Sequence, residues 1–352
     1  MRFIYFKAGG FPVNKERLSA WFRNFAEKEC KGSSKLYEHL SHQIAKDDEV
    51  LAVSSMAMEG QPVPNLLFGA VHFLLMKNAD HPLREYYPSL TDVPLNVKDS
   101  FPHFKDFCLE NRDAVISILE TRRVQTNEVR RTAYLYPSFC HVYDIAKKPL
   151  SLIEIGTSAG LQLLWDQYKY SYGDNEVYGN PSSPVHIESE IKGGRKPVFQ
   201  KNSPPVASRT GLDLHVCDLT DPDTALWLKA LIWPEHKERL QLFEQAADYF
   251  IQQPAKLMEG DGIALLREVI RDIPLDQAVC IFHTHVANQI PEHVKVQLMD
   301  TFKEIGRQRD VFHLYNNMWD GKLHLDYMLD GVLYENIIGE TDGHARWFTW
   351  EL

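Results

Sequence analysis

The chain has 352 residues, of which 44% are hydrophobic and 24% are charged, a composition typical of a globular protein with enough material for a large core. Its formal net charge of -10 disfavours extended contact with nucleic-acid phosphates, so we expect no nucleic-acid partner. Met1 leads directly into a short mixed segment, and the longest apolar run, 65–76, is too short to cross a bilayer. We therefore expect neither a signal peptide nor a membrane-bound protein.

The cysteines are odd in number and widely scattered, and no two have the spacing of a CxxC pair. They are Cys30, Cys108, Cys140, Cys217 and Cys280. This pattern indicates neither a disulfide framework nor a cysteine zinc site, so we expect no metal. A reducing cytoplasm is the location that fits it best.

Up to residue 148 the sequence has helical periodicity. Apolar residues recur at three-to-four spacing in 17–29, 34–47, 65–77 and 104–122, and proline-rich breaks separate these segments. The sequence therefore predicts a helical amino-terminal region over 1–148, which we expect to cap the rest of the chain.

From residue 149 onward, strands alternate with helices. The predicted strands are 149–156, 212–219, 255–262, 278–286 and 310–318. Alternation of this kind predicts an α/β domain over 149–352 with a mostly parallel sheet covered on both faces. Residues 170–210 are rich in Gly, Pro, Ser and charge and read as an insertion, and the end of the chain reads as an antiparallel ribbon.

The turn Gly156-Thr157-Ser158-Ala159-Gly160 fits two chemistries. It matches G-x-S-x-G, the elbow that presents a serine nucleophile in α/β-hydrolases. It also matches a loosened glycine-rich turn that holds a nucleotide-like cofactor at a helix N-terminus. A third interpretation is a tight strand–helix turn with a structural role only.

Neighbouring residues favour the cofactor turn. Glu154 ends a buried strand, where a carboxylate needs a partner such as a cofactor amine or a loop amide. The turn itself would point its N–H groups toward a ligand carboxylate or phosphate. A hydrolase needs an acid and a histidine further along, and Asp261 or Asp276 followed by a histidine would serve. The histidines in that order are His283, His313 and His344, but no oxyanion glycine cluster precedes the turn.

The order of motifs after residue 149 resembles class I S-adenosylmethionine-dependent methyltransferases. That resemblance implies a Rossmann-like sheet with S-adenosylmethionine as cofactor. The first turn would hold its methionine part, the acid after the second strand its ribose hydroxyls, and the third acidic turn its adenine. Carried over, the cofactor-binding residues are Glu154, Gly156, Thr157, Ser158, Ala159, Gly160, Asp218, Gly260 and Asp261, with Ser158 standing where the family has glycine.

Nearly the whole chain also resembles a bacterial family of unknown function, the domain-of-unknown-function 2332 family. The stretches that carry this resemblance are 61–75, 121–135, 153–173 and 209–240. The resemblance implies no activity, so function has to be argued from the site.

Polar residues gather in 121–131, just before the first strand. One interpretation is a solvated helix with paired charges. The other is that the segment leans over the cofactor site, where two arginines would meet an anionic substrate through paired N–H donors. The candidate substrate-binding residues are Arg122, Arg123, Gln125, Asn127 and Glu128, together with Asn288.

His283 and His285 sit two apart on a predicted strand and would share one face. Either is a candidate catalytic base for the proton of a nucleophile, and the alternative is that both are packed core residues. Taken together, the sequence favours methyl transfer from S-adenosylmethionine to a small or peptide-like acceptor. The alternatives are a serine hydrolase that uses Ser158 and a non-catalytic binding protein with the same fold.

Overall fold

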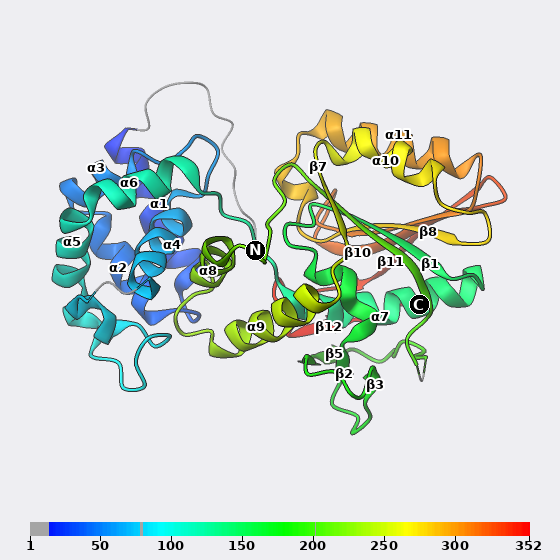
Figure 1. Cartoon of the computed structure of the whole chain (residues 1–352), viewed down its shortest axis with the longest axis horizontal. Coiled ribbons are helices and arrows are strands. Elements are labelled where there is room, and N and C mark those ends of the chain that lie inside the picture. The colour runs from blue at the N-terminus through cyan, green and yellow to red at the C-terminus, as the bar shows by residue number, and fades with distance from the viewer. Residues whose placement is uncertain (1–13, 78–79, 201) are drawn as a thin grey trace. The chain divides into compact units, whose positions relative to one another are not determined.

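The computed structural model describes residues 14–77, 80–200 and 202–352. The opening segment, in which we expect no signal peptide, lies outside these residues. The chain forms two compact units. Of the described residues, those from 14 to 126 together with 221–240 form the helical unit, and those in 127–220 together with 241–352 form the sheet unit (Figure 1).

The helical unit contains helices in all four segments predicted from the periodicity of the first half of the chain, shorter helices between those segments, and one helix from residues 221–240. They are α1 (Lys15–Phe25), η1 (Ala26–Cys30), α2 (Lys35–Ile44), α3 (Asp48–Ser54), α4 (Val63–Met76), η2 (Pro82–Tyr86), η3 (Val97–Asp99), α5 (Ser100–Glu110), α6 (Arg112–Thr121) and α8 (Pro222–Ala230). Asn14, Ser34 and Asp47 cap three of the helices by accepting backbone N–H groups. Gly69 lets α4 and α8 approach closely, since a Cβ there would lie 3.1 Å from Trp227.

The sheet unit is built on a sheet of seven strands. They are β1 (Leu150–Ile155), β6 (Val206–Asp213), β7 (Lys256–Glu259), β8 (Ala278–His283), β9 (Val311–Asn316), β10 (Lys322–Leu329) and β11 (Val332–Glu340). Their order is β11-β10-β9-β8-β1-β6-β7. Neighbouring strands pair in parallel from β7 through β6, β1 and β8 to β9. β10 pairs antiparallel with both β9 and β11. The predicted mostly parallel sheet with an antiparallel carboxyl-terminal ribbon is confirmed.

The path of the chain through the sheet reverses at β1. After β1 the chain adds β6 and β7 on one side, then crosses back to add β8 and β9 on the other. Parallel strands all end at one edge of a sheet, so β1, β6 and β8 bring their last residues together there. Glu154 of β1 pairs in register with Gly211 of β6 and Phe282 of β8.

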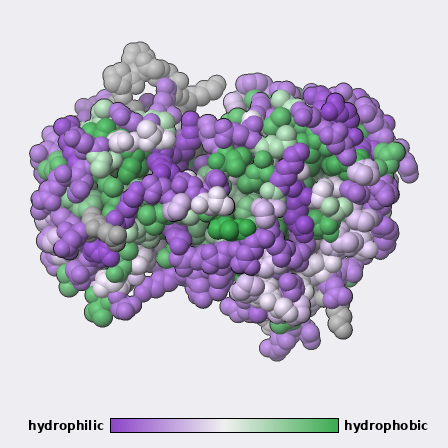
Figure 2. Space-filling view, in the orientation of Figure 1, coloured by the Kyte–Doolittle hydropathy of each residue, from purple (hydrophilic) through white to green (hydrophobic). Residues whose placement is uncertain are grey.

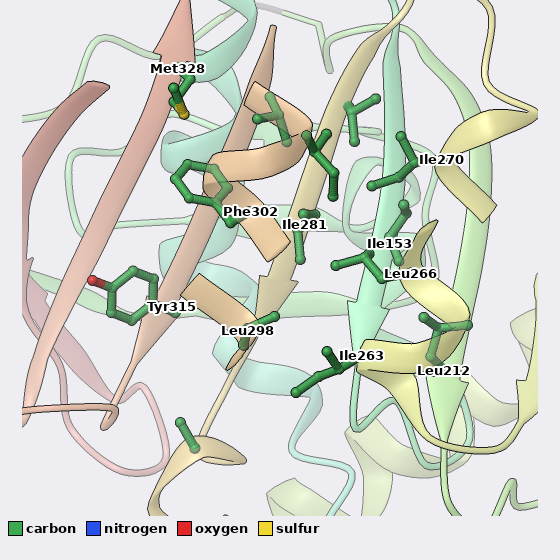
Figure 3. Close-up of a cluster of buried hydrophobic side chains, with 14 of the residues drawn as sticks. Ile153, Leu212, Ile263, Leu266, Ile270, Ile281, Leu298, Phe302, Tyr315 and Met328 are labelled. Carbon is green, nitrogen blue, oxygen red and sulfur yellow. The ribbon is translucent and has the colours of Figure 1, made fainter. Parts of the chain in front are cut away.

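Helices cover both faces of this sheet, which explains why β1, β8 and β9 are almost wholly buried. On one face, α10 (Gly262–Arg271) and α11 (Glu292–Gly306) pack a cluster that includes Ile153, Ile281 and Phe302 (Figure 3). On the other lies α7 (Thr132–Ala146), whose Phe139 stacks on Trp165 and meets Phe282 edge-on. Figure 1 shows α7 across the sheet from α10 and α11.

Two parts of the sheet unit differ from prediction. The second strand spans 206–213 rather than 212–219, because Leu214 is 65% exposed and the apolar run beyond it does not continue the strand. A short 3-10 helix, η5 (Leu161–Gln167), follows the first turn in place of a longer helix.

The predicted insertion at 170–210 holds small β structure. Here β2 (Lys169–Ser171), β3 (Tyr178–Gly179) and β4 (His186–Glu188) form one sheet, and β5 (Glu190–Lys192) pairs with β12 (Trp347–Thr349). The carboxyl-terminal strand β12 therefore pairs with a strand of the predicted insertion.

All five cysteines are buried thiols. In the part of the chain that the structure describes, no helix has both the length and the apolar character needed to cross a bilayer. Polar residues cover much of the face shown in Figure 2.

Candidate functional site

The turn that follows β1 has an unusual backbone. Gly156, Ser158 and Gly160 all have positive φ, at 74°, 51° and 80°, a region that glycine adopts freely and serine only at a cost. A Cβ at Gly156 would lie 2.4 Å from Val286 Cγ2, and one at Gly160 would lie 2.8 Å from Phe250. Both backbone conformation and close packing therefore require glycine at these two positions.

Most amides of the turn already have partners inside the protein. Gly156 and Thr157 donate to the Leu212 carbonyl, at 2.7 and 3.3 Å, and Gly160 donates to the Thr157 carbonyl. The Ser158 amide donates to Asp213 Oδ2 at 2.7 Å. The prediction that these N–H groups face a ligand anion is wrong for these four amides, because β6 accepts three of them and the turn itself accepts the fourth.

Glu154 is a buried carboxyl group beside the turn. Its side chain is 4% exposed, and Thr157 Oγ1 donates to its Oε2 at 2.6 Å. Burial raises the pKa of Glu154 to about 8, with a smaller raising effect from Asp213, while Thr157 and Arg131 act in the opposite direction. Glu154 is therefore protonated at neutral pH and needs no cationic partner to stay buried.

Asp213 is a site residue that the sequence analysis missed. It is the last residue of β6, and its Oδ1 accepts the His215 amide at 2.9 Å while its Oδ2 accepts the turn amide of Ser158. The predicted second acid, Asp218, is exposed beyond the strand, where its Oδ1 accepts the amide and hydroxyl of Thr220. Asp213 would have been found by placing the strand over 206–213.

The third acidic turn lies close to Asp213 but has its own structural role. The Gly260 amide donates to the Asp213 carbonyl at 2.8 Å. Asp261 caps α10 by accepting the amides of Ile263 and Ala264 at 2.9 and 3.1 Å. A part in adenine binding stays a prediction for both residues.

The polar segment 121–131 is not the continuous helix that one interpretation implied. α6 ends at Thr121 and η4 (Val129–Arg131) begins eight residues later, with no helix or strand between them. Within the helical unit, the Arg122 guanidinium lies 5.6 Å from the Phe73 ring, and the Arg123 carbonyl accepts Trp227 Nε1 at 2.8 Å. Gln125 also belongs to that unit. A substrate role for these three stays a prediction.

Asn127 and Glu128 belong to the sheet unit and contact the turn region directly. Asn127 Nδ2 donates to Ser158 Oγ at 2.5 Å. Gln162, two residues after the turn, donates through Nε2 to the Glu128 carbonyl at 3.2 Å and accepts Thr284 Oγ1 at 3.0 Å. A hydrogen-bonded chain thus joins the segment before α7, the turn after β1 and the end of β8.

Glu128 also holds a histidine from the far end of the chain. Its carboxyl group is 3% exposed, and its Oε2 lies 3.0 Å from His344 Nδ1. Arg131 Nε donates to the Gly343 carbonyl at 3.2 Å and so fixes the loop that carries this histidine. The sequence indicates His344 only as a possible hydrolase partner, and no local signal marks a contact between residues 216 positions apart.

The two predicted catalytic histidines do not share a strand face. β8 ends at His283, and His285 has a φ of 56° in the turn beyond it. His283 is 1% exposed and packs against His313 and Tyr315, at ring-centroid distances of 5.2 and 5.7 Å. Burial lowers the pKa of His283 to about 4 and that of His285 to about 2, so both are neutral at physiological pH.

A protein-family model matches residues 19–350 of the chain. The matching family is described as uncharacterised protein conserved in bacteria, DUF2332. The chain belongs to the DUF2332 family. No curated protein and no solved structure matches it.

Ser158 of this DUF2332 protein does not have the surroundings of a hydrolase nucleophile. It is 4% exposed, its hydroxyl accepts from Asn127, and it lies 3.6 Å from Cys217 Sγ. Across the described ranges, no histidine lies within hydrogen-bonding distance of this hydroxyl, and no group of three metal-ligating side chains gathers. Asn288 Oδ1 is buried and meets no hydrogen-bond partner among the described residues, so a ligand hydrogen-bond donor would satisfy it.

Proposed function

We propose that this DUF2332 protein is an S-adenosylmethionine-dependent methyltransferase acting on a small or peptide-like acceptor in the cytoplasm. The observation that carries the proposal is the position of Asp213, at the end of β6 and hydrogen-bonded to the glycine turn after β1. The reversal of strand order at β1 supports the proposal of a Rossmann-like sheet, in which ligands bind where the strand order reverses. Here that point is the edge shared by β1 and β8.

The hydrogen-bonding groups at the turn fit the ribose of the cofactor better than its carboxylate. A carboxylate offers about four lone-pair sites, and Asp213 uses two of them for backbone amides, which leaves capacity for a ribose diol. The amides of Gly156, Thr157 and Ser158 are bonded to β6 and that of Gly160 is bonded within the turn, so we assign no ligand carboxylate to these four. When bound, the cofactor would supply an electrophilic methyl group, and the protein would supply orientation.

The test is thermal denaturation with S-adenosylhomocysteine. A ligand that binds only the folded protein stabilises it by about 2.7 kcal/mol at a hundred times its Kd, so the Tm should rise with ligand concentration. Asp213→Asn should abolish most of that rise, because the amide replaces one acceptor by a donor. Asp218→Asn is the matched control and should leave the rise intact.

Each outcome discriminates between assignments. If Asp218→Asn removes the ligand-induced rise and Asp213→Asn does not, the ribose acid is Asp218, as the sequence alone suggested. A well-folded protein whose Tm does not change at millimolar S-adenosylhomocysteine would refute the cofactor assignment.

One observation supports a second candidate, a non-catalytic protein that keeps this fold. Val286, from the turn after β8, would lie 2.4 Å from a Cβ on Gly156, so the two turns pack on each other beside the proposed cofactor position. Together with the internally bonded amides, this contact favours a turn with a structural role. Under this alternative, neither S-adenosylmethionine nor S-adenosylhomocysteine changes the Tm.

A further inference from the structure

β11 is the outermost strand at one side of the seven-stranded sheet, and only part of its outer side is covered. Among the described residues, no strand of the sheet pairs with that side. At the end of β11, the Glu351 amide donates to the Ile338 carbonyl at 3.0 Å. Nearby, the Glu340 amide donates to Thr349 Oγ1 at 2.8 Å. The part of β11 that the carboxyl-terminal segment leaves uncovered is 332–337, which we call the open edge.

The open edge lacks the residues that commonly prevent a strand from pairing with another chain. Lysine and proline, which block many edge strands, are absent from 332–337, and its one charged side chain is Glu335. Its exposed side chains are mainly apolar, since Val332, Tyr334 and Ile337 are 54%, 43% and 40% exposed. An edge of this kind is a template for a further strand.

A row of aromatic side chains crosses the sheet and ends at the open edge. Tyr327 of β10 pairs in register with Phe312 of β9 and with Tyr334 of β11, so the three side chains share one face. The ring centroids of Phe312 and Tyr327 are 5.5 Å apart, and those of Tyr327 and Tyr334 are 4.9 Å apart. Phe312 is 1% exposed and Tyr334 is 43% exposed. The row is therefore enclosed at its inner end and can be extended from Tyr334.

Two copies of the open edge can pair in only a few registers. A two-fold axis perpendicular to the sheet makes the two strands antiparallel and places one residue opposite its own copy. Within the open edge, an axis at Tyr334 pairs 332–336 of both chains, and an axis at Glu335 pairs 333–337. The second register places two carboxylates directly opposite each other, which is destabilising. The favoured register has Tyr334 on the axis.

The backbone of β11 is oriented for this register. The Asn336 amide points toward β10, where it donates to Asp326 Oδ1 at 3.4 Å. Successive amides of a strand point to opposite sides, so those of Leu333 and Glu335 point outward. An axis at Tyr334 places Leu333 of each chain opposite Glu335 of the other, and their outward groups can exchange hydrogen bonds. The two copies of Tyr334 then form a non-hydrogen-bonded pair, with Cα atoms about 4.5 Å apart.

We propose that this protein forms a dimer through the open edge and that Tyr334 lies on the two-fold axis. A second copy is the occupant that the aromatic row favours, because its own row meets the first one ring to ring. The net charge of -10 on each chain opposes association. Such a short edge also buries less than the roughly 1,200 Å² of a standard interface. The dimer therefore forms at high chain concentration, and it does not depend on the proposed methyl transfer.

The first experiment measures the mass of the full chain by sedimentation velocity, from low to high micromolar concentration with a reducing agent present. The dimer fraction should rise with concentration. Tyr334→Lys should remove the dimer, because it places two ammonium groups opposite each other, and Tyr334→Phe should keep it. Leu275→Lys is the matched control, because Leu275 is 74% exposed elsewhere in the sheet unit. A wild-type protein that is monomeric at every concentration would overturn the proposal. So would a dimer that persists in a folded Tyr334→Lys variant with an unchanged Tm.

The second experiment tests the register by disulfide cross-linking, which the buried native thiols allow. Tyr334→Cys should form a covalent dimer under mild oxidation, because the expected Cα separation lies within the disulfide range of about 4.4–6.8 Å. Val332→Cys and Asn336→Cys should link to each other when mixed, and neither should link to itself. Leu275→Cys should stay monomeric. Linkage of Val332→Cys to itself, with none at Tyr334→Cys, would overturn the assigned axis.

Discussion

At the scale of single residues, Glu154 shows how burial alone can set the charge of a site. The side chain is 4% exposed at the end of β1, and its pKa is raised to about 8 mainly by loss of hydration. The sequence predicts that a carboxylate buried at this position has a partner. The structure provides a hydroxyl donor, Thr157, and the carboxyl group keeps its proton.

This raised pKa predicts a pH dependence of stability. Between the unfolded value of 4.5 and about 8, the folded state holds a proton that the unfolded state has lost, so the free energy of unfolding falls as pH rises. The loss is on the order of 5 kcal/mol at one shifted group. Glu154→Gln keeps the hydrogen-bond acceptor without the titration and should lose less stability across that window. Urea denaturation at pH 5, 7 and 8.5 measures the difference, and parallel curves for both proteins would show that Glu154 is not protonated when folded.

Ser158 occupies a backbone conformation that suits glycine. Its φ is 51°, while its hydroxyl is bonded to Asn127 at 2.5 Å. Ser158→Ala keeps the strained backbone and loses the hydrogen bond, whereas Ser158→Gly loses the bond but relieves the strain. We expect the glycine variant to be more stable than the alanine variant by about 1 kcal/mol in chemical denaturation. Equal stabilities would mean that the backbone at Ser158 is unstrained.

The same residue also tests the hydrolase alternative. Because Ser158 is buried and no described histidine activates it, a fluorophosphonate probe should leave it unlabelled. Intact-protein mass spectrometry measures this directly. Covalent labelling that Ser158→Ala removes would establish a nucleophilic serine and replace the methyltransferase proposal.

At the scale of elements, the site depends on the turns after β1 and β8 packing on each other. A Cβ at Gly156 would lie 2.4 Å from Val286, and the residue has a φ of 74°. Gly156→Ala should therefore destabilise the protein by about 2 kcal/mol or more, through strain and overlap together. Gly173→Ala is the matched control, because Gly173 has a φ of 81° and nothing within 4 Å.

The two contributions can be separated in the same experiment. Adding Val286→Ala to Gly156→Ala should recover part of the lost stability, by removing the overlap but not the backbone strain. If Gly156→Ala costs no more than Gly173→Ala in chemical denaturation, then the two turns do not press on each other.

At the scale of the whole molecule, the chain is acidic and carries its cysteines as buried thiols in both units. The melting temperature should therefore be the same with and without a reducing agent, and a thiol reagent should react only as the protein unfolds. Rapid reaction of one thiol in the native protein would identify a cysteine whose surroundings open readily.

The order of strands and helices after residue 149 was predictable because apolar period and turn residues are local signals. They predicted β1, β7, β8, β9 and the antiparallel ribbon correctly. The bounds of β6 were wrong, since an apolar run such as 212–219 can continue past the last paired residue. That error moved the predicted acid from Asp213 to Asp218.

What the sequence alone determined is the α/β class, the mostly parallel sheet, the family and the glycine turn, all of which depend on residues close together in the chain. Only the tertiary structure decided which groups meet at the turn. Asp213 binds its amide, Val286 packs on its first glycine, and Glu128 holds His344 from 216 residues away. These contacts arise from sheet order and loop packing, because neither periodicity nor spacing determines which distant segments a fold brings together.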